Sequence, residues 1–446
     1  MNWSLSHYRL HIRRFVMGKT EDFLRKHMLT AASVDTDKTL DFVLSEMKKG
    51  LEDEESSSLR MIATYVQPDV EIVPGASVIV LDAGGTNFRT CLVTFDENRQ
   101  PVISDFRKVG MPGVKSEVSA AEFFSILADN VERLIDKSDR IGFCFSYAAT
   151  ITEDHDGIPL VFSKEIKAPE VIGKPLGKNL LKELEKRGHD VSKKKVAIVN
   201  DTVATLLAAK AGRPDYASSY VGFILGTGTN TAYIEDNENI KKISIGKGRQ
   251  IINVESGCLA LELGDLDKKF VNSTKDPNSY WFEKKISGAY IGPFSACVIE
   301  EAIAEGILSK TFAERYKEIE PLNTTRMSNY LEMCHNSDYD LVRCVEGSEE
   351  DATALYKILK SIIERAGKLT AINLTAAVLA SGEGKQPREP VVINADGTTF
   401  YKTEFLEFYT RLYLDEILEK KHGRYYEIVQ IDNSPTLGAA IAGLAI

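Results

Sequence analysis

Three short runs, far apart in the chain, combine residue types that could bind phosphate and move a proton. They are Leu81–Arg89 (LDAGGTNFR), Val199–Thr205 (VNDTVAT) and Gly222–Asn230 (GFILGTGTN). The first and third place an apolar, strand-like stretch directly before a Gly/Thr turn, where backbone N–H groups and hydroxyls can approach an anion that bulkier residues would block. The middle run supplies a carboxylate, Asp201. These runs predict two phosphate-binding hairpins with an acid–base group between them.

The first run also offers a candidate metal ligand. Asp82 directly follows the apolar stretch Val78–Leu81. It could cap the turn through Gly84 and Gly85, or it could hold Mg²⁺ through water while Thr86 and the neighbouring amides face phosphate. The second Gly/Thr hairpin downstream favours the magnesium interpretation, because two clamps could enclose a polyphosphate for in-line phosphoryl transfer.

Asp201 has two interpretations as well. It follows the apolar run Val196–Val199 and precedes a helix expected over 202–210, so it could be an N-cap that contributes roughly 1 kcal/mol. It could instead be a general base that takes the proton from an attacking hydroxyl. An ordinary Asp pKa of about 3.9 makes a weak base, but a loose phosphoryl-transfer transition state needs little activation of the nucleophile.

Length, composition and charge exclude several classes of protein. A chain of 446 residues predicts two or three domains, and its 43% hydrophobic and 27% charged residues are typical of a globular protein. We expect no membrane partner, because no apolar run approaches the roughly 20 residues that span a bilayer. A net charge of −10 and the lack of a basic, aromatic stripe predict no nucleic-acid partner. The N-terminus has no apolar core of a secretory signal, so we expect a cytoplasmic protein.

Strand-like and helical patterns alternate along the chain, which predicts the α/β class. Helical spacing of apolar residues marks 39–51, 294–305, 352–366 and 405–419. Apolar β-runs are found at 77–81, 90–94, 141–145, 196–199, 220–225, 231–234, 389–393 and 426–431. A Gly/Thr hairpin follows a strand near Asp82 and again near Gly226, which suggests two similar halves around a shared cleft.

The order and wording of these motifs resemble the hexokinase family, of the glucokinase/hexokinase type, within the actin-like ATPase superfamily. The matching blocks cover nearly the whole chain: 42–51, 61–66, 81–89, 143–146, 199–205, 226–230, 252–257, 286–292 and 438–440. The resemblance implies a two-domain actin-like ATPase (ribonuclease H-like) fold with an interdomain cleft. The smaller domain would comprise 62–195 joined by the C-terminal helix 436–446, and the larger one 1–61 and 196–435.

The resemblance also implies roles for individual residues. Asp201 would be the catalytic base on the sugar's 6-hydroxyl, and Lys164 would contact the sugar and the transferring phosphoryl group. The implied sugar-binding residues are Ser146, Ser163, Lys164, Asn200, Asp201, Asn230 and Glu255. ATP and Mg²⁺ would be bound by a first site of Asp82, Gly84, Gly85, Thr86 and Asn87, and a second of Gly226, Thr227 and Gly228. Gly397 and Gly438 resemble remnants of the adenosine-side motifs.

Four departures from the family pattern all lie on the sugar side. The chain has Ser-Tyr-Ala-Ala at 146–149 where the family has Ser-Phe-Pro-Cys, and it has Pro293 where the family has a sugar-binding Glu. Ser256 replaces a residue that is often aromatic, and Glu165 replaces a common Gly. The sequence therefore predicts an ATP-dependent kinase for glucose or a similar hexose. A sugar-responsive binding or regulatory protein with little turnover, or a kinase for mannose, fructose or an amino sugar, stays open.

Overall fold

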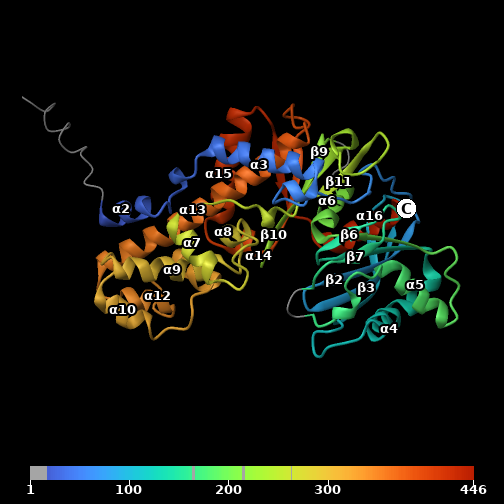
Figure 1. The fold of residues 1–446 in the computed structure, drawn as a ribbon, viewed down its shortest axis with the longest axis horizontal. Coiled ribbons are helices and arrows are strands. Elements are labelled where there is room, and N and C mark those ends of the chain that lie inside the picture. Colours follow the sequence, from blue (N-terminus) through green and yellow to red (C-terminus); the bar gives the residue numbers. More distant parts are fainter. Residues whose placement is uncertain (1–17, 163–165, 213–215, 263) are drawn as a thin grey trace, which may run out of the picture. The chain divides into compact units, whose positions relative to one another are not determined.

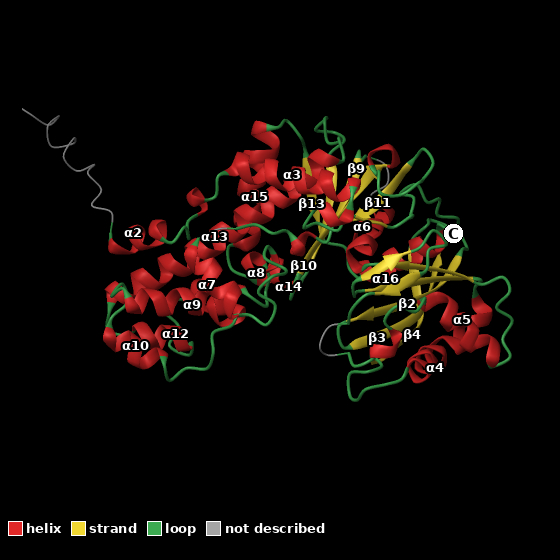
Figure 2. Cartoon of the chain, viewed as in Figure 1, coloured by secondary structure: helices red, strands yellow, loops and turns green. Residues whose placement is uncertain are grey.

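The structure is a computed structural model that describes residues 18–162, 166–212, 216–262 and 264–446. It divides into two compact units. The helical unit comprises Met1–Asp35, Leu261–Thr370 and Tyr401–Arg411. The sheet unit comprises Thr36–Ala260, Ala371–Phe400 and Leu412–Ile446. All strands of the described residues belong to the sheet unit, whereas the helical unit contains helices and loops (Figures 1 and 2).

The sheet unit contains two large sheets with the same internal topology. The five-stranded sheet has the order β4 (Pro101–Gly110), β3 (Asn87–Phe95), β2 (Ser77–Gly84), β5 (Arg140–Phe145), β8 (Lys195–Val199). The six-stranded sheet has the order β1 (Ile62–Ala63), β11 (Arg249–Asn253), β10 (Thr229–Asp236), β9 (Ser219–Leu225), β12 (Val391–Asp396), β13 (Tyr426–Val429). In each, an antiparallel meander is followed by two parallel strands, with β1 an extra edge strand in the second. The two similar halves predicted from the repeated hairpins are thereby confirmed.

The helices that follow the last strand of each sheet cross over to the other sheet. Helix α6 (Asp201–Gly212) follows β8 and packs on β9 and β12, whereas α16 (Ser434–Leu444) follows β13 and packs on β2 and β5. The two helices also pack closely on each other, since a Cβ on Gly438 would come within 1.9 Å of the carbonyl oxygen of Ala204. Only glycine permits this approach of two helix backbones. The crossover fixes the start of α6, and hence Asp201, against both sheets.

Strand β2 is buried on both faces. Val78 and Val80 point into a core that also contains residues of α6 and α16, and Ile79 and Leu81 point into a second core. The second core is completed by α4 (Ala120–Val131) and α5 (Leu176–Lys186). Because side chains alternate along a strand, Asp82 emerges on the same face as Val78 and Val80. The strand therefore delivers a carboxylate to the buried side that faces α6.

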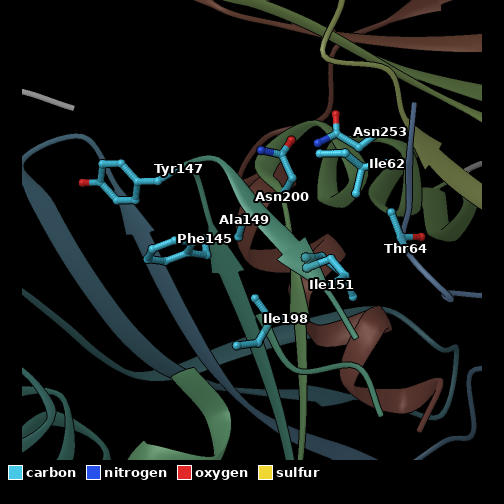
Figure 3. Close-up of a pocket in the computed structure, with 10 residues that line it drawn as sticks. Ile62, Thr64, Phe145, Tyr147, Ala149, Ile151, Ile198, Asn200 and Asn253 are labelled. Carbon is cyan, nitrogen blue, oxygen red and sulfur yellow. The ribbon is translucent and has the colours of Figure 1, made fainter. Parts of the chain in front are cut away.

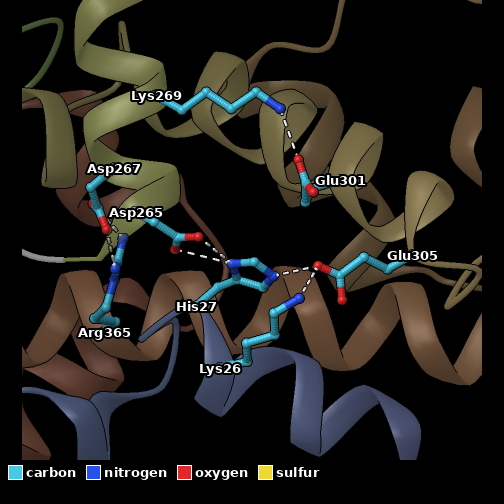
Figure 4. Close-up of polar contacts among 8 residues, drawn as sticks. All are labelled: Lys26, His27, Asp265, Asp267, Lys269, Glu301, Glu305 and Arg365. Atoms are coloured by element: carbon cyan, nitrogen blue, oxygen red, sulfur yellow. Dashed lines mark hydrogen bonds and ion pairs between the residues drawn. The ribbon is translucent and has the colours of Figure 1, made fainter.

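The helical unit is built around part of a long helix, α13 (Glu349–Ala380). Its other helices are α2 (Lys19–Lys26), α7 (Asp265–Ser273), α8 (Glu283–Ile286), α9 (Ile291–Ala304), α10 (Lys310–Tyr316), α11 (Thr324–Glu332) and α12 (Asp340–Val345), with most of α15 (Leu406–Leu414). His27, directly after α2, is 3% exposed and has both ring nitrogens against carboxylates (Figure 4): Nδ1 is 2.9 Å from Asp265 and Nε2 is 2.8 Å from Glu305. Both contacts are hydrogen bonds only if the ring carries two protons. Through these two contacts His27 ties α2 to α7 and to the end of α9.

The predicted elements are found, with longer bounds in several cases, but five of the described strands were missed, among them β4 and β11. β4 is a mostly exposed edge strand, so it lacks the apolar pattern of a buried strand. β11 is only five residues long and begins with Arg249 and Gln250. The early helix is α3 (Thr36–Glu52), and α15 continues into a π-helical segment at Asp415–Lys421. Short α14 (Thr398–Lys402) and the hairpin of β6 (Ala149–Ile151) and β7 (Gly157–Pro159) complete the description.

The predicted domain division stays a prediction. Its C-terminal helix does pack on β2 and β5 of the five-stranded sheet, but β8, which that division assigns mainly to the larger domain, pairs with β5. Within the described ranges, no helix is both long and apolar enough to cross a bilayer.

Candidate active site

The first predicted phosphate hairpin is formed as expected. β2 and β3 pair up to Gly84 and Asn87, so the turn consists of Gly85 and Thr86. Gly85 has φ +57°, in the left-handed region that glycine adopts without strain. A Cβ on Gly84 would lie 3.2 Å from Oγ of Ser146, so this glycine leaves the space beside Ser146 open. The predicted residues of this hairpin therefore lie together at one turn.

Asp82 is buried and paired with a cation that the sequence analysis gave no role. Its carboxylate is 4% exposed, and Oδ2 accepts a hydrogen bond from Nη1 of Arg89 at 2.6 Å. Burial raises the pKa of Asp82, and the charge and hydrogen bond of Arg89 oppose the rise. Arg89 stands directly opposite Asp82 in the β2–β3 register, a pairing that the hairpin pattern could have indicated.

The donor set around Asp82 restricts how a metal could bind. Among the described residues, no group of three or more His, Cys, Asp or Glu side chains is placed to hold a metal ion. A cation beside Asp82 would therefore need most of its ligands from phosphate and water. Mg²⁺ fits that arrangement, since it keeps several waters and is commonly held by one or two carboxylates plus substrate phosphates.

The segment after β5 is fixed by a tyrosine rather than by the proline of the family pattern. The hydroxyl of Tyr147 donates a hydrogen bond of 2.5 Å to the carbonyl oxygen of Gly85. Its ring packs on Phe145 and Phe162, with centroid distances of 5.0 and 5.3 Å. The preceding residue, Ser146, donates its backbone N–H to Ala83. Tyr147 therefore ties the predicted sugar loop to the turn of the first phosphate hairpin.

Asp201 begins α6 and has an unusual pKa. Its Oδ1 accepts the backbone N–H of Thr202 at 2.8 Å, but Oδ1 of Asn200, the residue before the helix, accepts the same N–H at 2.9 Å, so Asn200 rather than Asp201 is the N-cap. The residue is partly exposed, yet protein atoms surround its carboxyl group closely. Burial and then the charge of Glu255 raise the pKa of Asp201 to about 6, although hydrogen bonds from Thr202 and Ser146 oppose the rise. The expectation of an ordinary pKa was wrong: Asp201 is a stronger base than an exposed aspartate.

A network of side-chain amides connects the region around Asp201 to Glu255. Nδ2 of Asn230 donates to Oδ1 of Asn253 at 2.7 Å and lies 3.4 Å from Oδ1 of Asn200. Nδ2 of Asn253 donates to Oε1 of Glu255 at 2.8 Å. Burial raises the pKa of Glu255, and the hydrogen bond from Asn253 opposes the rise. The network brings together donors and acceptors of the kind that bind sugar hydroxyls.

Asn253 is the residue of this network that sequence reasoning missed. It is 4% exposed and bridges two predicted sugar-binding residues, Asn230 and Glu255. It lies in the block 252–257, which carries the resemblance to hexokinases, so a signal was present. Figure 3 shows Asn253 and Asn200 on the same side of a small hollow of about 10 Å³ with Ile151 and Ile198 below them. This hollow has room for about one water molecule.

The second predicted hairpin is also formed, and Gly397 lies against it. β9 and β10 pair Leu225 with Thr229, which leaves Gly226, Thr227 and Gly228 as the turn. A Cβ on Gly397, whose φ is +119°, would lie 2.3 Å from the carbonyl oxygen of Leu225. In addition, the hydroxyl of Thr399 donates to the carbonyl of Gly226 at 2.8 Å. The turn and the segment after β12 are therefore in direct contact, and Thr399 is a second residue that the sequence analysis did not identify.

Not every predicted residue joins this group. Gly438 lies against α6, where its contact with Ala204 explains the glycine by helix packing, and its role toward a nucleotide stays a prediction. Ser163 and Lys164 fall outside the described residues, as does Glu165. Pro293 lies in the first turn of α9, in the helical unit.

Comparison with known proteins gives the family. Two family models, both described as hexokinase, match residues 19–211 and 220–445. The hexokinase of Schistosoma mansoni is 28% identical over 437 residues, 92% of this chain and 93% of that protein. Hexokinase HKDC1 of Homo sapiens is 28% identical over 420 residues, 88% of this chain and 45% of that protein. The chain thus spans about half the length of several curated relatives that it matches, and nearly all of the Schistosoma protein.

Solved structures show the same fold. The hexokinase of Schistosoma mansoni complexed with glucose superposes with a TM-score of 0.76 at 23% identity, covering 96% of this chain and 99% of that one. A second hexokinase crystal structure gives 0.75 at 20% identity. The predicted two-domain, actin-like α/β fold is thereby confirmed. The chain belongs to the hexokinase family.

Proposed function

We propose that this protein is an ATP-dependent hexose kinase that transfers phosphate to the 6-hydroxyl of glucose or a similar hexose, with Asp201 as the general base. The observation that carries the proposal is the environment of Asp201. Its pKa of about 6 lies near neutral pH, where a carboxylate can both be ionised and accept a proton. Belonging to the hexokinase family supports the same conclusion.

The amide network is the proposed sugar-binding surface. Asn200, Asn230 and Glu255 would hydrogen-bond sugar hydroxyls, together with Ser146, whose side chain hydrogen-bonds Asp201. The hydrogen bonds of Asn253 to Asn230 and to Glu255 fix the orientation of these two side chains before the sugar binds. Ser163 and Lys164 keep the roles that the family resemblance implies for them, as proposals.

The two hairpins are the proposed phosphate sites. The backbone N–H groups and hydroxyls of Gly84–Asn87 and of Gly226–Gly228 would bind the phosphates of ATP, with Gly397 on the adenosine side. Mg²⁺ would neutralise phosphate charge during the transfer, and Asp82 would hold it through water. Arg89 keeps the carboxylate of Asp82 oriented through their hydrogen bond of 2.6 Å.

We also propose that the protein is located in the cytoplasm.

The test is ADP formation from ATP and Mg²⁺ by the purified protein with glucose, mannose, fructose, glucosamine or N-acetylglucosamine, and without sugar. Rapid turnover on one of these sugars, lost in Asp201→Asn, is the expected result. Asp201→Asn keeps the acceptor for the N–H of Thr202, so loss of activity would not report a lost helix cap. Absence of sugar-dependent turnover, with sugar still raising the melting temperature, would instead support the binding or regulatory protein.

A further inference from the structure

A buried excess of positive charge lies in the helical unit. Arg365 and Asp267, 1% and 3% exposed, form a two-pronged ion pair, with Nη1 to Oδ2 at 2.8 Å and Nη2 to Oδ1 at 3.0 Å (Figure 4). Lys285, on α8, is also 3% exposed, and its Nζ lies 3.7 Å from Oδ1 of the same aspartate. Two cations therefore share one carboxylate, and these three side chains carry one positive charge that has no counterpart among them.

This excess charge destabilises the ammonium form of Lys285. Burial lowers the pKa of Lys285 to about 8, and the charges of Arg365 and Lys284 act in the same direction while Asp267 opposes them. A buried charge without a partner is costly, so a buried lysine in such surroundings is a candidate for a functional site.

Lys285 is one of the residues that line a hollow of about 160 Å³. Its walls include Asp267, Val271 and Trp281, with the exposed Asn272 on the same helix as Val271. At the rim, Lys268 and Glu262 pair with each other at 3.0 Å, so their charges cancel. This pair therefore does not offset the excess positive charge of the group formed by Lys285, Asp267 and Arg365.

We propose that this hollow binds a small organic monocarboxylate. A single negative charge would balance the excess charge of the Lys285–Asp267–Arg365 group. Carboxylate oxygens could accept from Nζ of Lys285, while Val271 and the ring of Trp281 would cover an apolar group of a few carbons. A phosphate dianion would reverse the charge imbalance rather than cancel it. The site is formed by residues of the helical unit alone and has no part in the proposed phosphoryl transfer.

Trp281 gives a direct assay for this proposal. The chain contains two tryptophans, Trp3 and Trp281, so in the variant Trp3→Phe, Trp281 is the only tryptophan of the full-length protein, and excitation at a wavelength that tyrosine does not absorb reports it alone. Butanoate should change its fluorescence saturably at pH 7. In that background, Lys285→Met should weaken butanoate binding by about tenfold to a hundredfold, the value of a charge-assisted hydrogen bond. Lys268→Met, which removes a lysine from the rim of the same hollow, is the matched control and should leave binding within about threefold.

A second measurement separates binding from a folding defect. NMR of ¹³C-methylated lysines in the otherwise unmodified chain, with Lys285→Met to assign the signal, follows the titration of Lys285 itself. Butanoate should raise the pKa of Lys285, because the anion favours the ammonium form. The proposal is overturned if butanoate leaves both this pKa and the Trp281 emission unchanged, if Lys285→Met binds as tightly as the parent, or if inorganic phosphate binds more tightly than butanoate in a Lys285-dependent manner.

Discussion

The pH dependence of sugar phosphorylation should report the environment of Asp201. As the general base, Asp201 has to be ionised, so kcat/KM should fall as the pH drops through its pKa of about 6. With that pKa, about nine-tenths of the molecules carry the base form at pH 7 and about one-tenth at pH 5. The predicted loss between these two values is therefore about tenfold.

Glu255→Gln is the perturbation that tests the cause of this pKa. Burial is the larger cause of the rise from 3.8 to about 6, and the charge of Glu255 is the second. Glutamine keeps an oxygen that can accept the hydrogen bond from Asn253 but removes the charge. The inflection should therefore move to lower pH by about half a unit to one unit, and it should stay above 3.8 because burial remains.

The assay is kcat/KM for the preferred sugar from pH 4.5 to 8 at constant ionic strength, with the donor concentration corrected for its own protonation. If Glu255→Gln also loses a sugar contact, kcat/KM falls equally at every pH. The pH of the inflection still depends on the pKa of Asp201 alone. Glu238→Gln removes the same charge from an exposed position and should leave the inflection in place. An inflection in Glu255→Gln that stays at the parent value, or moves to higher pH, would refute the assignment.

Three further predictions concern stability and coupling. The pKa of Asp201 is higher in the folded than in the unfolded protein, so ionisation of Asp201 lowers the free energy of unfolding as the pH rises from about 4 through 6. Asp201→Asn should therefore increase the free energy of unfolding in urea at pH 7.5 by about 1–3 kcal/mol. A decrease would contradict this. Tyr147→Phe removes the hydrogen bond to Gly85 and should lower the free energy of unfolding by about 1 kcal/mol. It should also raise the KM for ATP, since the turn of the first phosphate hairpin loses a contact that holds it. An unchanged KM would argue against coupling between Tyr147 and the binding of ATP. His27→Gln should cost about 1–2 kcal/mol and speed tryptic cleavage within α2, because glutamine has one nitrogen where the imidazole ring places two nitrogens against different carboxylates. Equal cleavage rates would show that these ring contacts are dispensable.

Much of the fold and of the site followed from local sequence. The apolar runs located most of the strands, and the repeated hairpins predicted the duplicated topology. The turns at Gly85 and Gly226–Gly228 were predictable because glycine is required where the backbone turns sharply or φ is positive. β4 was not predictable from its pattern, because an exposed edge strand has no buried face to keep apolar.

The properties of the site depended on contacts that span the chain. The pKa of Asp201 is raised by burial and by the charge of Glu255, and neither can be read from the run that contains Asp201. Likewise, the network at Asn253 joins residues of β10, β11 and the end of β8, and Tyr147 reaches Gly85 across the sheet.

The sequence by itself determined the family, the class of fold, the two hairpins and the identity of the candidate base. Only the tertiary structure decided the strength of that base and the excess charge at Lys285. The physical reason is that turn preference and hydrophobic periodicity act over a few residues, whereas desolvation and charge interaction depend on everything that surrounds a group in space.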